Sequence, residues 1–499
     1  MNFARDVVDR MPAGDLALVE LARDGARREW SFGEVSERSA RFAGALRARG
    51  VNTGDVVMTL IGNRPEWVIA MCACFRIGAV VLPCTEQLRA KDLRLRLAVA
   101  KPSLIVADAR NGAELERALA HPANGSATPV LLVPDDDLFT AEPTAAIELA
   151  AEEPCLITFT SGTAGEPKAV VHAQRYLAGQ ALQAERWLDA KAGELVWCTA
   201  ASGWSKSARN VFIAPWLSGA AALLHDARFD PAERLELLAR ERVNVLCMAP
   251  TEYRVIAKRA TLEPLPDLRT MVAAGEALNP EVLHAWREAI GLEIRDGYGQ
   301  TETGQLTGIG SDQRARPGSM GRALDGVRLG VIEDELVVHP PSVPTFFLGY
   351  LGEGVARGQD GSWTVEDRRN GGPWHTGDRV REGEDGYLYF EGRNDDVIVS
   401  AGYRIGPFEV ESALVAHPAV AEAAAVAAPD EERGSVVRAV VVPRDGYAPT
   451  LELARELQEH VKRETAPYKY PRIVDFVEEL PKTASGKVRR AALRSGGAR

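Results

Sequence analysis

The sequence lacks an excess of basic charge. Its 499 residues include 59 Lys plus Arg against 70 Asp plus Glu, which gives a formal net charge of −11 at pH 7. Binding to duplex nucleic acid or to an anionic membrane needs a basic face that neutralises phosphates. We therefore expect neither nucleic acid nor an anionic membrane surface to be a main partner of this chain.

Cysteines are few, and uninterrupted apolar runs are short. The six cysteines have neither the Cys-x-x-Cys spacing nor the nearby histidines of a zinc site, so we expect them to be reduced and buried. The longest apolar stretch, 67–84, is broken by Arg76 and Gly78 and is short for a bilayer span, which favours a buried helix that runs into a strand. The first residues show no apolar signal segment. Together these features predict a cytoplasmic protein without a membrane span.

The length exceeds what one hydrophobic core usually serves, so at least two domains are expected. From about residue 50 onward, short β-rich runs alternate with helical patterns, which is typical of parallel sheets covered by helices. Near residue 340 the sequence turns rich in Gly and Pro, with short strands. We predict an α/β fold with a large N-terminal domain at 1–393, which has helix-covered parallel sheets and a small β-barrel-like part. A small α+β C-terminal domain at 394–499 follows.

The most informative segment lies at 158–168 and reads TFTSGTAGEPK. Hydroxyl and glycine residues after an apolar strand offer backbone N–H groups and hydroxyls to a polyphosphate, and Lys168 adds a positive charge. The segment is not a Walker A loop, because Pro167 precedes the lysine and Ala169 follows it. Phosphate binding is one interpretation of this segment, and a surface turn rich in glycine and serine is the other.

Four further segments carry polar groups that suit a nucleotide. DGYGQTET at 296–303 joins an aromatic ring to a carboxylate, an arrangement suited to base stacking and to Mg²⁺. HTGD at 375–378 ends in a carboxylate that can accept hydrogen bonds from both hydroxyls of a ribose. The segment 392–406 offers Arg393 and Arg404 to anions, and PKTASGK at 481–487 presents Lys487 on a glycine-flanked loop. Each segment taken alone is also compatible with a solvated loop.

In this order, the five segments resemble the adenylate-forming superfamily of acyl-CoA synthetases over nearly the whole chain. The chain looks most like the medium-chain acyl-CoA synthetases at 203–207, 214–219, 228–230 and 465–471. The resemblance implies that a carboxylic acid, ATP and coenzyme A (CoA) give acyl-CoA, AMP and diphosphate through an acyl-adenylate. It also implies Mg²⁺, a medium-chain fatty or aromatic acid, and a monomer or small homo-oligomer.

The resemblance also assigns residues to the nucleotide. The phosphates are expected at Thr160, Ser161, Gly162, Thr163, Ala164, Gly165, Glu166, Pro167 and Lys168. Adenine and the acyl carboxylate are expected to border Gly275, Glu276, Ala277, Asp296, Gly297, Tyr298, Gly299, Gln300 and Thr301. The implied roles of the remaining residues are metal binding for Glu302, ribose binding for Asp378 and nucleotide contact for Arg393.

A second set of implied residues serves the change between the two half-reactions. Lys487 is implied to reach the α-phosphate and the carboxylate during adenylation, with Arg404 on the substrate or phosphate side. The C-terminal domain is implied to be mobile, to rotate about a hinge at Asp395, and to present a turn made of Ala401, Gly402 and Tyr403. CoA is expected to meet Gln87, Arg433, Tyr468, Lys469 and Tyr470.

The acyl pocket is where the chain departs from the family pattern. Trp204 and the stretch 211–216 are its expected walls, although core packing is an equal alternative for Trp216. Family members commonly have an aspartate where this chain has Ala201, and Lys206 is an unusual neighbour for an acyl tunnel. These departures raise the hypothesis that the acid carries a second polar group.

Two alternative functions stay open at this point. One is an adenylation enzyme that loads a carrier protein or another acceptor instead of CoA, which the match at Arg433 disfavours. The other is a catalytically inactive nucleotide-binding regulator, which the joint presence of Lys168, Glu302 and Lys487 disfavours.

Overall fold

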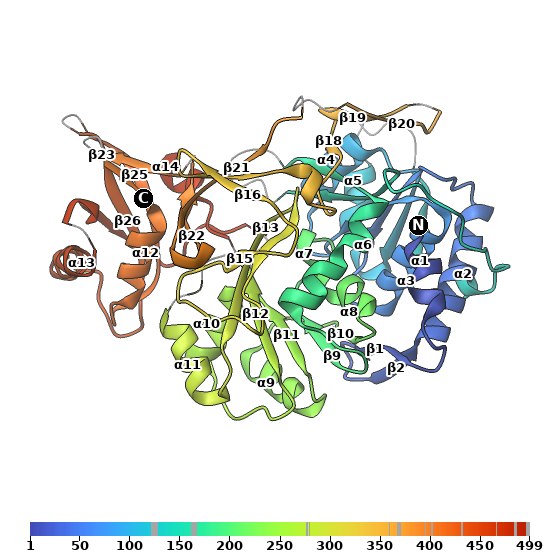
Figure 1. The fold of residues 1–499 in the computed structure, drawn as a ribbon, viewed down its shortest axis with the longest axis horizontal. Helices are drawn as coiled ribbons and strands as arrows, with labels where there is room; N and C mark the ends of the chain where they lie inside the picture. Colours follow the sequence, from blue (N-terminus) through green and yellow to red (C-terminus); the bar gives the residue numbers. More distant parts are fainter. Residues whose placement is uncertain are drawn as a thin grey trace.

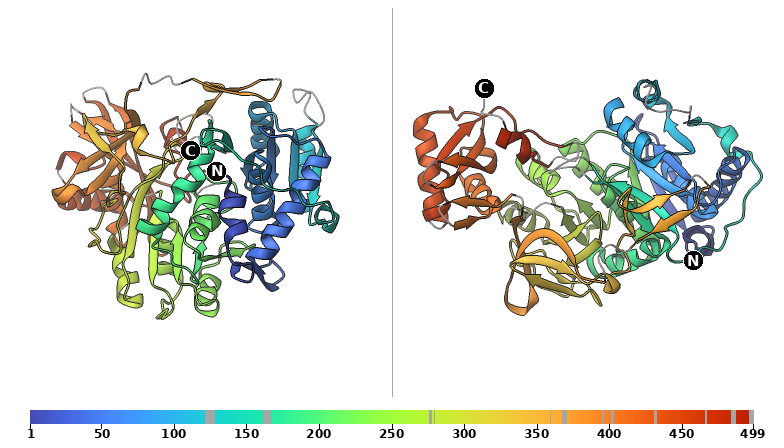
Figure 2. Two further views of the ribbon diagram at one scale, coloured as in Figure 1. Left: turned by 45° about the vertical axis from the view of Figure 1, so that its right-hand side comes forward. Right: turned by 90° about the horizontal axis from the view of Figure 1, so that it is seen from above.

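The protein is described from a computed structural model that covers residues 1–120, 128–160, 167–275, 278, 280–358, 360–366, 371–394, 396–400, 403–430, 433–465, 467–483 and 487–495. Its N-terminal residues form a large part, and the last hundred or so residues form a smaller part beside it (Figures 1 and 2). Both parts combine helices with sheets, so the predicted α/β class is confirmed. Within these residues, every helix is too short or too polar to cross a bilayer.

The first large sheet is mainly parallel and has nine strands in the order β15-β14-β13-β12-β11-β9-β10-β1-β2. Its strands are β1 (Leu16–Leu21), β2 (Arg27–Ser31), β9 (Leu195–Cys198), β10 (Ala221–His225), β11 (Val245–Met248), β12 (Thr270–Ala274), β13 (Ile294–Gln300), β14 (Gly304–Gly308) and β15 (Arg322–Ala323). Apolar residues of α9 (Pro231–Arg240), α10 (Pro250–Arg259) and α11 (Pro280–Ile290) pack on one face. Strands such as β11 are apolar at every position because helices cover both faces of a parallel sheet.

The second large sheet has the order β20-β19-β18-β8-β7-β4-β3-β5-β6. Its strands are β3 (Val56–Leu60), β4 (Val80–Cys84), β5 (Leu104–Asp108), β6 (Val130–Val133), β7 (Pro154–Phe159), β8 (Ala169–Ala173), β18 (Gly349–Leu351), β19 (Gly354–Arg357) and β20 (Trp363–Val365). On its outer face lie α4 (Ala90–Ala100) and α5 (Gly112–Leu119). These helices complete an apolar core that belongs to this sheet alone.

A shared core lies between the two large sheets. Its helices are α1 (Phe3–Asp6), α2 (Phe32–Ala48), α3 (Pro65–Ile77), α6 (Gln174–Gln183), α7 (Ser205–Ala208) and α8 (Ala214–Leu217), together with two π-helical segments, η5 (Ala184–Leu188) and η6 (Arg209–Ile213). The stretch 67–84 is a buried helix that runs into a strand, as predicted, because it spans α3 and β4. All six cysteines are buried and free, again as predicted.

A small antiparallel sheet stands next to these layers. It consists of β16 (Leu329–Ile332), β17 (Glu335–Val338), β21 (Trp374–Glu382) and β22 (Leu388–Arg393). This sheet is the small β part that the Gly- and Pro-rich sequence after residue 340 predicts. Its last strand leads toward the C-terminal part.

The C-terminal part has a hydrophobic core of its own. Its elements are β23 (Ile398–Ser400), β24 (Tyr403–Ile405), α12 (Pro407–Ala416), β25 (Val420–Asp430), β26 (Gly434–Pro443), α13 (Leu451–Glu464), β27 (Ile473–Phe476) and α14 (Arg490–Ser495). Pro407 opens α12 in its first turn, where a missing N–H is not needed. Val410, Leu414 and Leu457 centre the core. This separate core supports the predicted boundary after Arg393, which stays a prediction.

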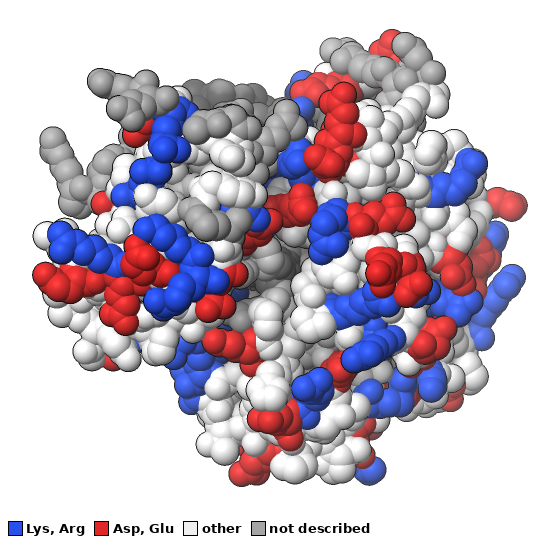
Figure 3. Space-filling model, turned by 60° about the vertical axis from the view of Figure 1, so that its left-hand side comes forward, with Lys and Arg blue, Asp and Glu red and all other residues white. Residues whose placement is uncertain are grey.

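The surface between the two parts is hollowed. On the face drawn in Figure 3, acidic and basic side chains alternate around a depression near the centre.

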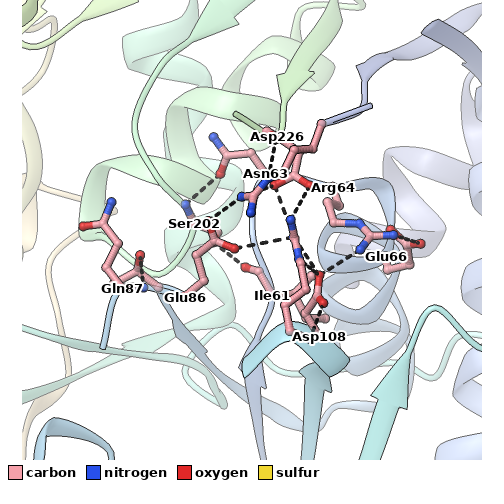
Figure 4. Close-up of polar contacts among 12 residues, drawn as sticks. Ile61, Asn63, Arg64, Glu66, Glu86, Gln87, Asp108, Ser202 and Asp226 are labelled. Atoms are coloured by element: carbon pink, nitrogen blue, oxygen red, sulfur yellow. Dashed lines mark hydrogen bonds and ion pairs between the residues drawn. The ribbon is translucent and has the colours of Figure 1, made fainter. Parts of the chain in front are cut away.

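The carboxyl ends of strands from both large sheets meet in a network of charged side chains (Figure 4). Asp108, at the end of β5, is almost fully buried and pairs with Arg64 at 2.8 Å and with Arg110 at 2.7 Å. Arg110 in turn reaches Asp226, at the end of β10 in the other sheet, at 2.9 Å. The network therefore fastens one sheet to the other.

Replacing Asp108 tests how much this network contributes. Asp108→Ala leaves two arginines short of a buried counter-charge, so we expect the free energy of unfolding to fall by about 3 kcal/mol. Urea denaturation measures it. Glu29→Ala, which removes an exposed partner of Arg27 on β2, is the control and is expected to change stability by less than about 0.5 kcal/mol. Equal effects of the two substitutions would contradict the proposed fastening.

Candidate active site

Several of the predicted nucleotide residues converge on the carboxylate of Asp378. The residue lies on β21 directly opposite Arg393 on β22, and Arg393 Nη1 stands 3.3 Å from Asp378 Oδ1. From β13, Tyr298 donates its hydroxyl hydrogen to Asp378 Oδ2 at 2.5 Å, and Gln300 Nε2 donates to the same oxygen at 2.7 Å. Burial raises the pKa of Asp378, and the positive charge of Arg393 and both hydrogen bonds oppose that rise.

The positive charge of Lys487 also acts on this carboxylate, where it lowers the pKa of Asp378 against the effect of burial. The loop that carries Lys487 is closed at its neck, where Thr483 N donates to Lys487 O at 2.8 Å. In contrast, β23, which precedes the turn at 401–402, lies on the side of the C-terminal part that faces away from the large part (Figure 1).

The predicted phosphate loop leaves the second sheet between β7 and β8, which pair antiparallel. Its neck is closed by two hydrogen bonds, Thr160 N to Lys168 O at 2.9 Å and Lys168 N to Thr160 Oγ1 at 3.0 Å. Lys168 Nζ lies 3.2 Å from Glu353 Oε2 and 4.7 Å from the ring centroid of Tyr350. Residues 161–166 of the loop lie outside the described residues.

Glu302, the predicted metal ligand, stands on the same side as Lys168. Tyr350 donates its hydroxyl hydrogen to Glu302 Oε1 at 2.8 Å, while its ring faces the lysine. Burial raises the pKa of Glu302, against this hydrogen bond and the charge of Arg393. No sequence pattern indicated Tyr350, because it lies on the short strand β18, outside any recognisable motif. Within the described residues, His, Cys, Asp and Glu nowhere gather in a group of three or more that suits a metal ion.

The predicted CoA residues fall into two places. Tyr403 and Tyr468 stack with ring centroids 4.3 Å apart, and Lys469 Nζ pairs with Glu409 Oε2 beside them. The structure does not bring this group to Gln87, which is exposed and precedes α4 in the large part. These residues therefore do not yet form one binding surface.

The remaining predictions divide by what the structure covers. Lys462 Nζ lies 4.3 Å from the ring centroid of Tyr470. Arg433 N donates to Asp430 Oδ1 at 2.9 Å. Six residues or side chains fall outside the described ones, namely Glu276, Ala277, Asp395, Ala401, Gly402 and the side chain of Arg404.

A cavity next to Asp296 and Gly275 is the candidate acyl pocket. It is lined by Trp187, Cys198, Thr199, Ala200, Lys206, Asn210, Cys247, Met248, Ala249, Glu252 and Ala274. Lys206 Nζ donates to Ala274 O at 2.7 Å, next to Gly275, whose φ of 101° lies in the left-handed region that favours glycine. The expected wall at 211–216 does not line the cavity. Trp216 from this stretch is buried in the shared core and donates Nε1–H to Ala17 O at 3.0 Å, and Trp204 is half-buried and stands aside.

Asp296 makes folding stability depend on pH. Burial raises its pKa from 3.8 to about 8, against a hydrogen bond from Gly297 N and the charge of Lys206. The folded protein therefore keeps a proton that the unfolded chain releases, and stability falls as the pH rises from about 4 to about 8. Asp296→Asn mimics the protonated form. We expect the free energy of unfolding of this variant to exceed that of the wild type by at least about 2 kcal/mol at pH 8 and to equal it near pH 4.

Urea denaturation at pH 4, 6 and 8 measures this difference. Asp24→Asn, on an exposed turn, is a suitable control. A gap between Asp296→Asn and wild type that stays constant over the three pH values would show that Asp296 is ionised in the folded protein.

Comparison with known families places the fold and site in a class. The model described as AMP-binding enzyme matches residues 4–359, and the one described as AMP-binding enzyme C-terminal domain matches residues 409–487. The two models together span most of the large part and most of the small part. The class is therefore that of the AMP-binding enzymes.

Individual relatives narrow this class. The chain is 38% identical to the uncharacterized acyl-CoA ligase YtcI of Bacillus subtilis (strain 168), over 96% of this chain and 92% of YtcI. It is also 38% identical to the mitochondrial acyl-coenzyme A synthetase ACSM4 of Homo sapiens, over 99% of this chain and 90% of the relative. The crystal structure of the anthranilate CoA ligase AuaEII in complex with anthranoyl-AMP matches with a TM-score of 0.88 and 26% identity, over 99% of this chain and 97% of that one. This chain belongs to the acyl-CoA synthetases of the AMP-binding enzyme family, which confirms the resemblance found in the sequence.

Proposed function

We propose that the protein is an AMP-forming acid–thiol ligase that joins a carboxylic acid to CoA at the expense of ATP. The observation that carries this proposal is the meeting of Asp378, Arg393 and Lys487 at the junction of the two parts. These residues come from three separate motifs and one site uses all of them. The family assignment and the acyl-CoA ligase relatives support the same activity.

The reaction has two steps that this site must serve in turn. A carboxylate oxygen attacks the α-phosphorus of ATP, the bond to diphosphate breaks, and an acyl-adenylate forms. The thiol sulfur of CoA then attacks the acyl carbon, AMP leaves with the carbon–oxygen bond pair, and the thiol proton passes to solvent. The first step brings one anion to another, so positioned cations are needed to stabilise its transition state.

The described residues suit these tasks. Asp378 is an acceptor for the two hydroxyls of the ribose, and Arg393 lies beside it for the nucleotide. Lys487 is proposed to reach the α-phosphate and the incoming carboxylate. Lys168 now pairs with Glu353, which is exposed, so a triphosphate can replace that carboxylate as its partner.

Mg²⁺ is proposed at Glu302. This half-buried carboxylate has a raised pKa, so a divalent cation would stabilise its ionised form. Mg²⁺ is usually bound through one or two carboxylates together with substrate phosphates, which fits a single glutamate near the phosphate loop. When bound, the ion supplies positive charge to the triphosphate.

The acid is proposed to be a medium-chain fatty or an aromatic acid. The motifs shared with medium-chain acyl-CoA synthetases support the first class. The anthranilate CoA ligase, whose name gives an aromatic acid, supports the second. The acyl cavity is bordered by Met248, Ala249 and Ala274 on its apolar side.

Lys487 separates the two steps experimentally. We expect Lys487→Ala to slow acyl-adenylate formation about 10²- to 10³-fold, because one preorganised charge is lost from the transition state. Thioester formation from supplied acyl-AMP is expected to change little. Diphosphate release and thioester formation, each followed in a single turnover, measure the two steps.

Lys482→Ala is the matched control, because Lys482 belongs to the same loop but pairs with Glu422 at 2.6 Å. It is expected to leave both steps within about twofold of wild type. An equal loss of both steps in Lys487→Ala would remove the role proposed for this lysine.

The hinge proposed at Asp395 gives a second separation of the steps. A domain rotation concentrates backbone changes in a few residues at the ends of elements, and proline restricts such changes. Asp395→Pro is therefore expected to slow the thioester step at least about tenfold more than adenylation. Slowing of both steps to the same extent would place the hinge elsewhere.

A further inference from the structure

The floor of the acyl cavity is built from two π-helical segments, η5 and η6. Turns of this kind are rare and frequently lie at functional sites. Here η5 supplies Trp187 and η6 supplies Asn210 to the cavity lining, and Lys206 of α7 stands one turn before Asn210. Two irregular segments far apart in the sequence thus place polar side chains in one apolar core.

These side chains leave hydrogen-bond donors unused. Trp187 is fully buried, and its Nε1–H has no partner in the described part of the chain. Residue 297 is glycine, and a Cβ there would lie 2.7 Å from this nitrogen, so the glycine leaves it uncovered. Asn210 uses its Oδ1 to accept a hydrogen bond from Gln183 Nε2 at 2.8 Å, which leaves its Nδ2 only the weak acceptor Cys247 Sγ at 3.8 Å.

The cavity also carries positive charge that no ion pair within the described residues neutralises, and burial keeps Asp296 beside it protonated, with a pKa of about 8. Lys206 Nζ makes a single hydrogen bond, to Ala274 O, and its two other hydrogens are not used. Arg209, which precedes Asn210 in η6, is 3% exposed, and its Nε and Nη1 lack partners. Among the residues described here, no carboxylate lies within ion-pair distance of Lys206 or Arg209.

The carboxylate that lines the cavity is already engaged. Glu252 accepts the hydroxyl hydrogen of Thr199 and stands 3.4 Å from Arg234 Nη2. The cavity therefore has more unused hydrogen-bond donors than unused carboxylates, which favours a ligand with a hydrogen-bond acceptor. A buried donor that finds no acceptor costs about 1–3 kcal/mol, so a ligand that satisfies these donors gains over one that does not.

We propose that the acid substrate carries a second oxygen acceptor on its acyl group, either a keto carbonyl or a second carboxylate. This oxygen would take hydrogen bonds from Lys206, Trp187 and Asn210. The inference rests on the proposed function and narrows its substrate class to oxo acids and dicarboxylic acids. Arg209 adds favourable charge from behind the lining.

The position of the Lys206 side chain would also determine how much of the cavity volume is open to the acyl group. The free space measures about 40 Å³, which holds a few atoms and not a whole acyl group. The long, flexible side chain of Lys206 now ends at Ala274 O. An acyl group with an oxygen acceptor gives the ammonium a new partner as it moves away, whereas a plain alkyl group leaves it with none.

Matched acids test the proposal on the wild-type enzyme. Diphosphate release with ATP and CoA is measured for pentanoate, 4-oxopentanoate and pentanedioate, and for octanoate, 7-oxooctanoate and octanedioate. In at least one set, we expect kcat/KM of an oxygen-bearing acid to exceed that of the plain acid by at least about tenfold, because sites that hydrogen-bond a substrate group reject analogues without it. The better of the two oxygen-bearing acids identifies the group.

Two variants connect the preference to the cavity. Trp187→Phe keeps a ring but loses the N–H, and Lys206→Met keeps the stem but loses the charge, so both are expected to reduce the preference at least threefold. The control is Trp363→Phe on β20, which loses a hydrogen bond to Gly54 O at 2.9 Å far from the cavity and is expected to keep the preference.

The outcomes separate this inference from the proposed function. Turnover of plain acids as good as or better than that of their oxygen-bearing counterparts in both sets overturns the inference and leaves the ligase activity standing. A preference that survives in both cavity variants also overturns it. Failure to release diphosphate with every acid, including benzoate, overturns the proposed function and the inference with it.

Discussion

The arrangement of this protein depends on one buried carboxylate, that of Asp378. Its burial is tolerable because Arg393, Tyr298 and Gln300 direct a positive charge and two hydrogen atoms at it. These partners come from the first large sheet and the small antiparallel sheet, and Lys487 approaches from the C-terminal part. One group thus links polar side chains of three regions, in addition to the apolar contacts that the first large sheet makes with the small sheet. A nucleotide that takes over some of these hydrogen bonds can therefore influence all three regions at once.

Much of the fold was predictable because its elements follow strong local patterns. Apolar runs such as 104–107 and 130–133 became strands of a helix-covered parallel sheet, and Pro407 marked the start of α12. The candidate nucleotide residues were predictable for another reason. Loops that hold phosphates and sugars use glycine, hydroxyl and carboxylate residues in compact motifs, and these motifs are visible in a single sequence.

The acyl cavity shows where sequence patterns stop being informative. Trp187 and Asn210 line one cavity from two local π-helical turns, which no local pattern in the sequence indicates. Conversely, Trp216 has the apolar character of a pocket wall, yet the folding of α8 between the sheets places it in the core. Tyr350 was missed for a related reason, since its position beside Glu302 and Lys168 is created by the pairing of β18 with β8.

The independent core of the C-terminal part has a consequence for the timing of turnover. Contacts across the junction include polar ones such as Lys258 Nζ to Ala421 O at 3.1 Å, and polar contacts of this kind exchange with water at small net cost. Val410, Leu414 and Leu457 belong to a core within the small part, so a reorientation of that part would leave them packed against one another. Reorientation of the small part would then expose little apolar surface, and binding and release of the ligands would determine when it occurs. Bound triphosphate would retain the lysine loop, and departure of diphosphate would release it.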